Sequence, residues 1–187
     1  MKLKTTLLFI LISCSFSCHF FKEENQEKNN TNTPKEPAKL ALFLKLKKDF
    51  LTQNQEIVLI EKTNYSKLFW DFFDQTITPN QCATDINNDQ ILDYAFLINQ
   101  KNELKIVIAQ SNKKSYSFWM APFTLQKITP TGIQYSLSPQ PAGQTDVIKK
   151  QPETLILKKN AFVIKNLEQD IKILYDENGK IQLFDLL

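Results

Sequence analysis

Short apolar runs alternate with short polar breaks over the second half of the chain. The first three runs are separated by breaks rich in Asn and Lys, and they occupy Tyr94–Ile98, Leu104–Ala109 and Ser115–Met120. Runs of this length, rich in β-branched and aromatic side chains and bounded by polar turn residues, are typical of β-strands. The pattern therefore predicts an antiparallel meander.

The same pattern continues to the C-terminal end. Ile133, Tyr135 and Leu137 alternate with polar residues, which is typical of a strand with one face in water. The pair Asn178–Gly179 predicts a tight hairpin, because both residues accept positive φ. Pro and Gly residues within 138–145 predict a flexible loop. Further strands are predicted at Thr154–Lys158, Phe162–Asn166, Ile171–Tyr175 and Lys180–Leu186.

Two helices are predicted before the sheet. The leucines of Lys39–Leu51 alternate as in a strand, but Leu42, Leu46 and Phe50 also share one helical face. Two prolines just upstream suit a first helical turn, so we favour a helix. A short buried strand, Ile57–Ile60, follows.

The second helix is predicted after Asn64, which is a suitable N-cap residue. Trp70 lies off the apolar stripe of this segment, and Pro79 ends it. We interpret the stripe as core, with a ligand groove as the alternative, because exposed apolar patches can mark binding sites. Five residues form the stripe: Tyr65, Leu68, Phe69, Phe72 and Phe73.

Together these patterns predict an α+β fold. We expect a single antiparallel, β-rich domain over residues 39–187, built as a meander or curved sheet with one or two N-terminal helices. The chain has 42% hydrophobic and 23% charged residues, which is ordinary for a globular protein. No repeat of about 20–50 residues stands out, which argues against a multi-blade propeller.

Residues 1–18 combine a short apolar run with two cysteines. The apolar run Thr5–Ile12 is far shorter than the ~20 residues that cross a bilayer. The four residues that end at Cys14, Leu-Ile-Ser-Cys, resemble a lipobox, and Ser-Phe-Ser-Cys, ending at Cys18, is a second match. The resemblance implies cleavage before Cys14 or Cys18, a thioether-linked diacylglycerol on that cysteine and an acylated new N-terminus. An ordinary secretory leader is the alternative.

Residues 19–38 predict a disordered polar tether, because after two Phe they offer almost no apolar surface to bury. Glu23 and Glu24 resemble the acidic surface-export signal of some bacterial lipoproteins. The predicted location is therefore the bacterial cell envelope, anchored by lipid to a membrane. The outer membrane is favoured, with the domain facing the periplasm or the cell surface.

An acidic loop precedes the first strand of the meander. Calcium takes six to eight oxygen ligands in a flexible shell, and a tight loop can turn alternate side chains inward to meet it. The Ile91 carbonyl falls at position 7 of this loop, and position 9 often acts through water. Oxygen-bearing side chains fall at positions 1, 3, 5 and 9: Asp85, Asn87, Asp89 and Asp93. The loop is therefore a predicted calcium site.

The spacing resembles the EF-hand loop and, more closely, the D-x-N-x-D-x-x-x-D loops of dockerins, thrombospondin type 3 repeats and integrin-type FG-GAP repeats. Gln90 stands where Gly is usual, which costs about 1–2 kcal/mol in a left-handed turn. Phe96 stands where the EF-hand has its bidentate Glu, so further ligands must come from elsewhere. Asp71, Asp74 and Asp146 are candidates. The alternative is an Asx-rich surface turn that binds no metal.

Composition argues against several kinds of site. The basic residues are all Lys, and without Lys2 and Lys4 the chain has 21 lysines against 20 acidic residues. No basic face and no nucleic-acid partner are therefore predicted. His19 is the one His and lies beside the leader, which argues against a His-based triad or zinc site. Cys82 is either a lone core thiol or, if Cys14 is the lipidated residue, a disulfide partner of Cys18.

Three functions are consistent with the sequence. We favour a non-catalytic binding or structural module, stabilised by calcium, whose partner is an envelope protein or a glycan. The second is an envelope hydrolase that uses paired carboxylates, with Asp71 and Asp74 as the candidate pair. The third is a carrier for a lipid or other apolar ligand inside a curved sheet, to which the 14 Phe residues are suited.

Overall fold

The computed structural model of the chain describes residues 36–147, 153–167 and 170–185. The predicted leader, most of the predicted tether and both candidate lipidation cysteines lie outside these residues. Within them the helices are α1 (Glu36–Gln53) and α2 (Lys67–Phe72), with a 3₁₀ turn, η1 (Lys62–Asn64), before α2.

The strands fall into two groups of six along the sequence. Strands β1 to β6 are Ile57–Leu59, Gln81–Thr84, Asp93–Gln100, Glu103–Ser111, Tyr116–Met120 and Gln126–Lys127. Strands β7 to β12 are Tyr135–Gln140, Gly143–Val147, Glu153–Leu157, Ala161–Asn166, Asp170–Glu177 and Lys180–Asp185. The fold is thus α+β, with mostly antiparallel strands, as the sequence predicts.

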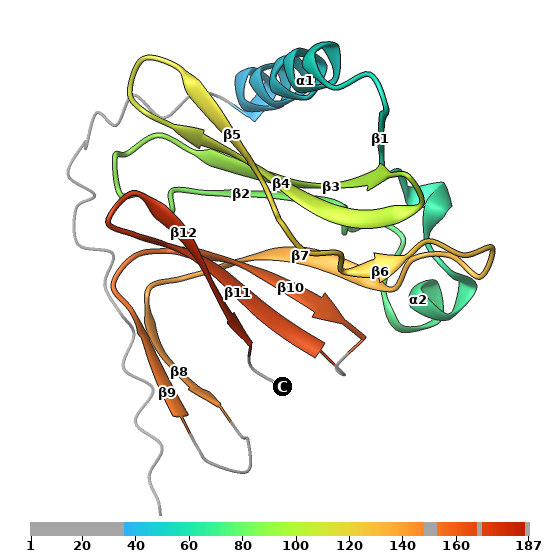
Figure 1. The fold of residues 1–187 in the computed structure, drawn as a ribbon. Coiled ribbons are helices and arrows are strands. Elements are labelled where there is room, and N and C mark those ends of the chain that lie inside the picture. Colours follow the sequence, from blue (N-terminus) through green and yellow to red (C-terminus); the bar gives the residue numbers. More distant parts are fainter. Residues whose placement is uncertain (1–35, 148–152, 168–169, 186–187) are drawn as a thin grey trace, which may run out of the picture. The chain divides into compact units, whose positions relative to one another are not determined.

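Two antiparallel sheets form the body of the domain (Figure 1). In the first sheet, β3 pairs with β4 on one side and with β1 and β2 on the other, and β4 also pairs with β5 and β6. The second sheet has the order β12-β11-β10-β7. β8 and β9 form a separate two-stranded ribbon. The predicted meander is therefore confirmed as β3–β4–β5.

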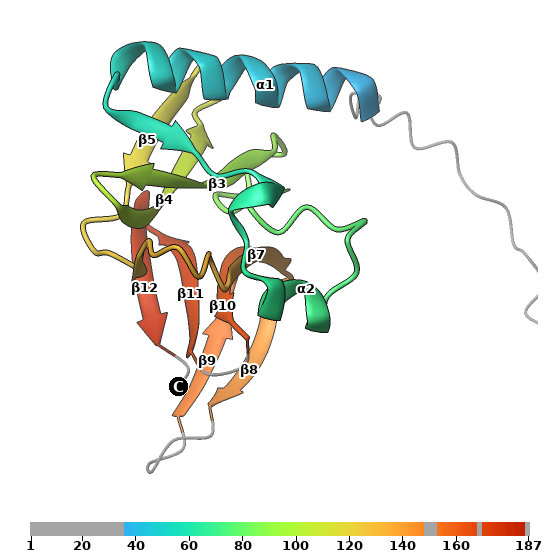
Figure 2. The ribbon, with the colours of Figure 1, turned by 90° about the vertical axis from the view of Figure 1, so that its right-hand side faces the viewer.

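The first sheet is the middle of three layers, with α1 on one face and the second sheet on the other (Figure 2). β3 is therefore buried on both faces. Tyr94, Phe96 and Ile98 pack with α1, whereas Ala95 and Leu97 face the second sheet. Burial of one large apolar side chain contributes about 1.5–3 kcal/mol. Both cores thus depend on this strand.

α1 packs through one face and is tied to β2 by a polar contact. Phe43, Leu46 and Phe50 are only 3–5% exposed and lie against the first sheet. Lys47 donates a hydrogen bond to Gln81 of β2, and its Nζ lies 4.4 Å from the Phe43 ring centroid. The first predicted helix is thus confirmed, and it begins three residues before the predicted start.

The second predicted helix is wrong in its start, and its predicted apolar stripe is only partly buried. Ser66, not Asn64, is the N-cap, and its hydroxyl accepts a hydrogen bond from the Phe69 N–H at 3.0 Å. Only six residues are helical. This short helix buries Phe69 but leaves Phe72 72% exposed, while Trp70, off the predicted stripe, packs against the core. Three residues of the predicted stripe pack in the core as expected: Tyr65, Phe69 and Phe73.

The segment predicted as a flexible loop at 138–145 is mostly strand. Residues up to Gln140 belong to β7, and Gly143 begins β8. Pro139 is tolerated because β7 is an edge strand, so the missing N–H need not break a ladder hydrogen bond. Pairing with β10 overrides the local turn signals here. Pairing also defines β2 and β6, which are short and are not predicted by their own patterns.

One buried carboxylate joins the two sheets. The Asp176 side chain of β11 is 1% exposed and accepts a hydrogen bond from Lys159 Nζ at 2.6 Å. It also accepts one from Gln110 Nε2 of β4 at 3.3 Å. Because Gln110 is the penultimate residue of β4, this link lies at the end of the first sheet where the acidic loop also attaches.

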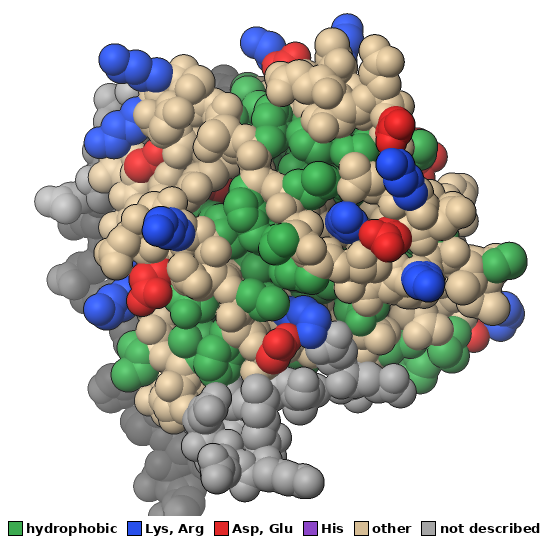
Figure 3. Space-filling model, viewed as in Figure 1, with side chains coloured by type: hydrophobic (Ala, Val, Ile, Leu, Met, Phe, Trp, Pro, Cys, Tyr) green, Lys and Arg blue, Asp and Glu red, His purple; other side chains and the backbone are tan. Residues whose placement is uncertain are grey.

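The surface view shows mixed charge. On the face in Figure 3, hydrophobic side chains gather near the middle, and lysines and acidic residues are interspersed around them. No helix in the described ranges is long and apolar enough to cross a membrane.

Gly132 is a position where close backbone packing leaves no room for a side chain. Its φ is +90°, and an added Cβ would lie 2.6 Å from the Ser66 backbone nitrogen. Gly132→Ala is therefore expected to lower the free energy of unfolding, measured by urea denaturation, by about 2–4 kcal/mol. Gly179→Ala is the control, because φ there is +80° but nothing lies within 4 Å. It should cost only about 1 kcal/mol, and equal losses would contradict the steric explanation.

Candidate metal centre

The loop at residues 85–93 connects β2 to β3 and turns back through two left-handed residues. Asn88 has a φ of 64° and Gln90 a φ of 70°. The left-handed conformation expected where Gln replaces the usual Gly is therefore present. Asn adopts this conformation readily, whereas Gln does so rarely, so the rest of the loop must hold Gln90 in place.

Asp85, at position 1, organises the first half of the loop. Its Oδ1 accepts hydrogen bonds from the N–H groups of Asn88 at 2.7 Å and Asp89 at 3.2 Å. Its Oδ2 accepts one from the Gln90 N–H at 2.8 Å. The carboxylate therefore faces the inside of the turn, and three N–H dipoles stabilise its negative charge.

Asn87 and Asp89, at positions 3 and 5, hold the loop against the end of β4. Asn87 Nδ2 donates to the Ser111 carbonyl at 2.8 Å, and the Ser111 hydroxyl donates to Asp89 Oδ2 at 2.6 Å. Asn87 Oδ1 accepts from the Asp89 N–H at 3.0 Å, and Asp89 Oδ1 accepts from the Ile91 N–H at 2.9 Å. Ser111 is buried, so its two bonds to the loop are partly shielded from water.

Asp93, at position 9, is the acidic residue of the loop that is fully buried, with 0% exposure. Its Oδ2 accepts from the Ile86 N–H at 2.8 Å, and its Oδ1 accepts from the Ser111 N–H at 2.6 Å. Burial raises the pKa of Asp93 to about 6; the two N–H groups oppose this shift, and the charge of Asp89 adds to it. The ionised form of Asp93 is thus poorly stabilised where it lies.

Tyr116 of β5 also binds the loop. Its hydroxyl donates to the Leu92 carbonyl at 3.0 Å. Burial raises the pKa of Tyr116 to about 12, and nearby negative groups, including Asp93 and Asp89, contribute to the increase. The negative potential of the loop therefore extends to β5.

The predicted ligands lie in one loop, but they do not form a ready-made cage. Every carboxylate oxygen of Asp85, Asp89 and Asp93 accepts a hydrogen bond, and each keeps a further lone pair. In the described part of the chain, no three acidic, His or Cys side chains gather closely enough to hold a metal ion. Holding a cation would draw these oxygens further inward, with the Ile91 carbonyl and water completing the shell.

Two of the three candidate supplementary ligands do not join the loop. Asp71 forms an exposed ion pair with Lys67 at 3.2 Å. Asp74 accepts from the Thr76 N–H at 2.7 Å, and this bond lowers the pKa of Asp74. The side chain of Asp146 lies outside the described residues. Asp71 and Asp74 are thus exposed and held by their own neighbours, which is not the paired arrangement that a carboxylate hydrolase needs.

Sequence reasoning misses Ser111 and Tyr116 as partners of the loop. The β3–β4 hairpin is centred on the Lys101–Asn102 turn, and this register places Ser111 beside the start of β3. Both turn residues have positive φ. The polar segment between the two strands does predict a turn. Its sequence alone does not show which two residues form the centre of that turn, so the position of Ser111 beside the loop is not predicted.

Cys82 of β2 is free, without a disulfide partner among the residues that the structure describes. Burial raises the pKa of its thiol to about 12, so the thiolate form is disfavoured. This environment fits the lone core thiol. The alternative partner, Cys18, lies outside the described residues.

Comparison with known proteins adds no assignment: no family model, no curated protein and no solved structure matches this chain. The function is therefore argued from the loop and its surroundings.

Ser111→Ala tests whether the loop depends on its contact with β4. It removes the hydroxyl that donates to Asp89, so we expect the free energy of unfolding to fall by about 1–2 kcal/mol in urea denaturation. Ser117→Ala is the matched control on the neighbouring strand, because that hydroxyl is exposed. Its effect should stay within about 0.5 kcal/mol. Equal effects would show that the Ser111 hydroxyl does not anchor the loop.

The pKa of Asp93 predicts a pH dependence. Its folded-state value, about 6, lies above the ordinary 3.8. The stability from the protonated form is thus fully present below about pH 4 and is lost as the pH rises through about 6. Asn does not titrate, so the advantage of the natural chain over Asp93→Asn, measured with chelator present, should be larger at about pH 4.5 than at about pH 7.5, by about 2 kcal/mol. An advantage that is constant, or larger at the higher pH, would contradict the assignment.

Proposed function

We propose that this chain is a lipid-anchored, non-catalytic binding module of the bacterial cell envelope, and that calcium stabilises its loop at residues 85–93. The observation that carries the proposal is the arrangement of this loop. Side chains at positions 1, 3, 5 and 9 all bond to N–H groups of the loop itself, and positions 4 and 6 are left-handed. These are the positions from which a calcium-wrapping loop supplies oxygens.

Calcium would supply the positive charge that the loop lacks. Asp85, Asp89 and Asp93 place up to three negative charges in one turn, and none of them forms an ion pair with a described lysine. Burial and the charge of Asp89 both raise the pKa of Asp93. The carboxylates, the Asn87 amide oxygen and the Ile91 carbonyl would hold the ion, whose role would be to neutralise this charge.

A loop ordered by calcium would also order the end of the sheet that it contacts. Its hydrogen bonds end on Ser111 of β4 and on Tyr116 of β5, so a rigid loop would fix the end of the β4–β5 hairpin. The proposed role of calcium is therefore structural, and the ordered surface would meet an envelope protein or a glycan.

The envelope location is supported by the sequence alone. An apolar run at Thr5–Ile12 is followed by Cys14 and Cys18, either of which is suitably placed for lipidation. If the lipid is anchored in the outer membrane, the polar residues after the cysteine would separate the domain from the lipid surface.

Calcium is expected to raise the melting temperature of the full chain, and a chelator to lower it. Binding to the native state alone contributes about 2.7 kcal/mol at a hundredfold excess of ligand over Kd. Calorimetric titration should show heat of binding that is lost in the double variant Asp85→Ala/Asp89→Ala. The double variant Asp71→Ala/Asp74→Ala, which also removes two aspartates, should retain it.

Two other outcomes would overturn parts of this proposal. If the natural chain shows no response to millimolar calcium, the loop is an Asx-rich turn that binds no metal. If an envelope hydrolase activity is present and is lost only in Asp71→Ala/Asp74→Ala, the protein is a paired-carboxylate enzyme.

Lipidation is tested by labelling with radioactive palmitate in a bacterial host. The natural chain should take up label and sediment with membranes, because the lipobox cysteine is acylated. Loss of label in either Cys14→Ser or Cys18→Ser identifies the modified residue, and Cys82→Ser should retain it. Label that persists when both leader cysteines are replaced would exclude lipidation at these positions.

A further inference from the structure

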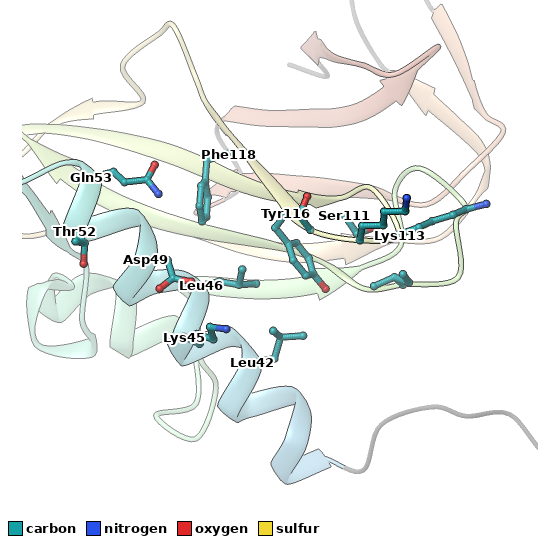
Figure 4. A pocket seen from close by; sticks show the side chains of 13 residues that line it. Leu42, Lys45, Leu46, Asp49, Thr52, Gln53, Ser111, Lys113, Tyr116 and Phe118 are labelled. Atoms are coloured by element: carbon teal, nitrogen blue, oxygen red, sulfur yellow. The ribbon is translucent and has the colours of Figure 1, made fainter.

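A groove lies between α1 and the end of the β4–β5 hairpin (Figure 4). Its volume is about 710 Å³, within the range of roughly 300–1,000 Å³ that is usual for small-molecule sites. One wall is the side of α1 from Leu42 to Gln53, and the other includes Tyr116 and Phe118 of β5. The α1 wall spans about 16 Å, at 1.5 Å per helical residue, so the groove is elongated.

The floor of the groove is apolar and belongs to a packed core. Leu46 is 5% exposed, and the half-buried Leu42, Tyr116 and Phe118 pack against the same cluster. The Phe118 ring lies 5.2 Å from the Phe50 ring, centroid to centroid. The floor is thus formed before any ligand arrives, and an apolar group laid on it would leave water.

The rim of the groove is basic. Lys45 of α1 and the turn residues Lys113 and Lys114 line it, are exposed and form no ion pair within the described residues. Asp49 is the one acidic residue among the described residues that line the groove. Among the lining residues, three lysines against one aspartate leave a net positive charge, which would attract an anion. The carboxylates of the adjacent loop reduce this attraction when no cation neutralises them.

The charge is concentrated toward one end. In Figure 4, Lys113 lies at the Tyr116 end of the groove, whereas the uncharged Thr52 and Gln53 lie at the opposite end, beyond Phe118. The lining therefore has an anion-attracting end and a long apolar floor.

We propose that this groove binds an elongated amphipathic anion, a molecule with a carboxylate, sulfonate or phosphate head and an apolar body. The head would lie near Lys113 and Lys114, and the body would lie along Leu46 and Phe118. Lys45, on the α1 wall beside Leu46, would add to the attraction for the anion. The proposal rests on the proposed function only in treating the domain as a binding module, and it does not require calcium.

The groove and the acidic loop share residues, which makes their occupancies interdependent. Ile91 and Ser111 line the groove, and the Tyr116 hydroxyl binds the Leu92 carbonyl of the loop. A cation in the loop would hold this wall and remove negative charge beside the groove. Calcium should therefore tighten anion binding, and the anion should tighten calcium binding by the same factor.

Two fluorescent probes with the same aromatic skeleton test the groove in the full chain. Anilinonaphthalene sulfonate carries a negative charge, whereas N-phenylnaphthylamine is neutral. Saturable binding of the sulfonate should weaken about fivefold in Lys113→Gln/Lys114→Gln, as expected for the loss of two exposed charges. Lys127→Gln/Lys158→Gln removes two exposed lysines elsewhere and should leave binding unchanged. Binding of the neutral probe should respond to neither double variant.

A single-residue pair on α1 provides a second comparison. Lys45→Glu reverses a charge that lines the groove and should weaken sulfonate binding by about tenfold. Lys48→Glu makes the same change on an exposed residue of the same helix that does not line the groove, and it should have no effect. All variants carry the same N-terminal residues, so any probe that binds to those residues binds equally in every variant.

The proposal is overturned if Lys45→Glu and Lys48→Glu have equal effects, if the two double variants do, or if the neutral probe binds as tightly as the sulfonate. Repeating the titration in chelator and in Asp85→Ala/Asp89→Ala separates the two proposals. Sulfonate binding that persists under both conditions supports the groove independently of calcium, and the calcium site is rejected only if the natural chain itself shows no calcium binding. Calcium binding without saturable sulfonate binding supports the calcium site and rejects the groove.

Discussion

The structure depends on the burial of β3 on both of its faces. Tyr94, Phe96 and Ile98 pack under α1, while Ala95 and Leu97 pack on the second sheet. Asp93 is the first residue of the same strand, so its carboxylate enters the protein together with the apolar side chains. A buried carboxylate needs hydrogen-bond donors, and Asp93 obtains them from the backbone of the loop and of β4. The shape of the acidic loop is therefore coupled to the packing of the core.

The loop and the groove form one electrostatic unit. Negative side chains gather in the loop, lysines lie along the groove, and Ser111 and Tyr116 lie between the two. Because the two regions share a wall, a change of charge in one alters the potential in the other. This coupling suits a module whose binding surface is ordered by an ion. It also connects the favoured sequence hypothesis, a calcium-stabilised binding module, with the third hypothesis, a carrier of an apolar ligand.

Local patterns predict most elements of the fold, and their failures have physical causes. The 3.6-residue period and a proline in the first turn identify α1, and Asn178–Gly179 has the two positive φ values that its hairpin requires. Asn64 is a plausible cap by residue type, but Ser66 is the residue whose hydroxyl reaches a helical N–H. The turn signals of 138–145 fail because pairing with β10 outweighs local preference on an edge strand.

The sequence by itself determined the β-rich class, the meander and the spacing of oxygen-bearing residues from Asp85 to Asp93, because periodicity and turn chemistry act over a few residues. It also indicated that Gln90 would occupy a strained position. Only the tertiary structure decided that Asp93 is the buried carboxylate of the loop, that Ser111 contacts the loop and that lysines from α1 and the β4–β5 turn line one groove. These facts depend on strand register and helix packing, which bring together residues that no local pattern relates.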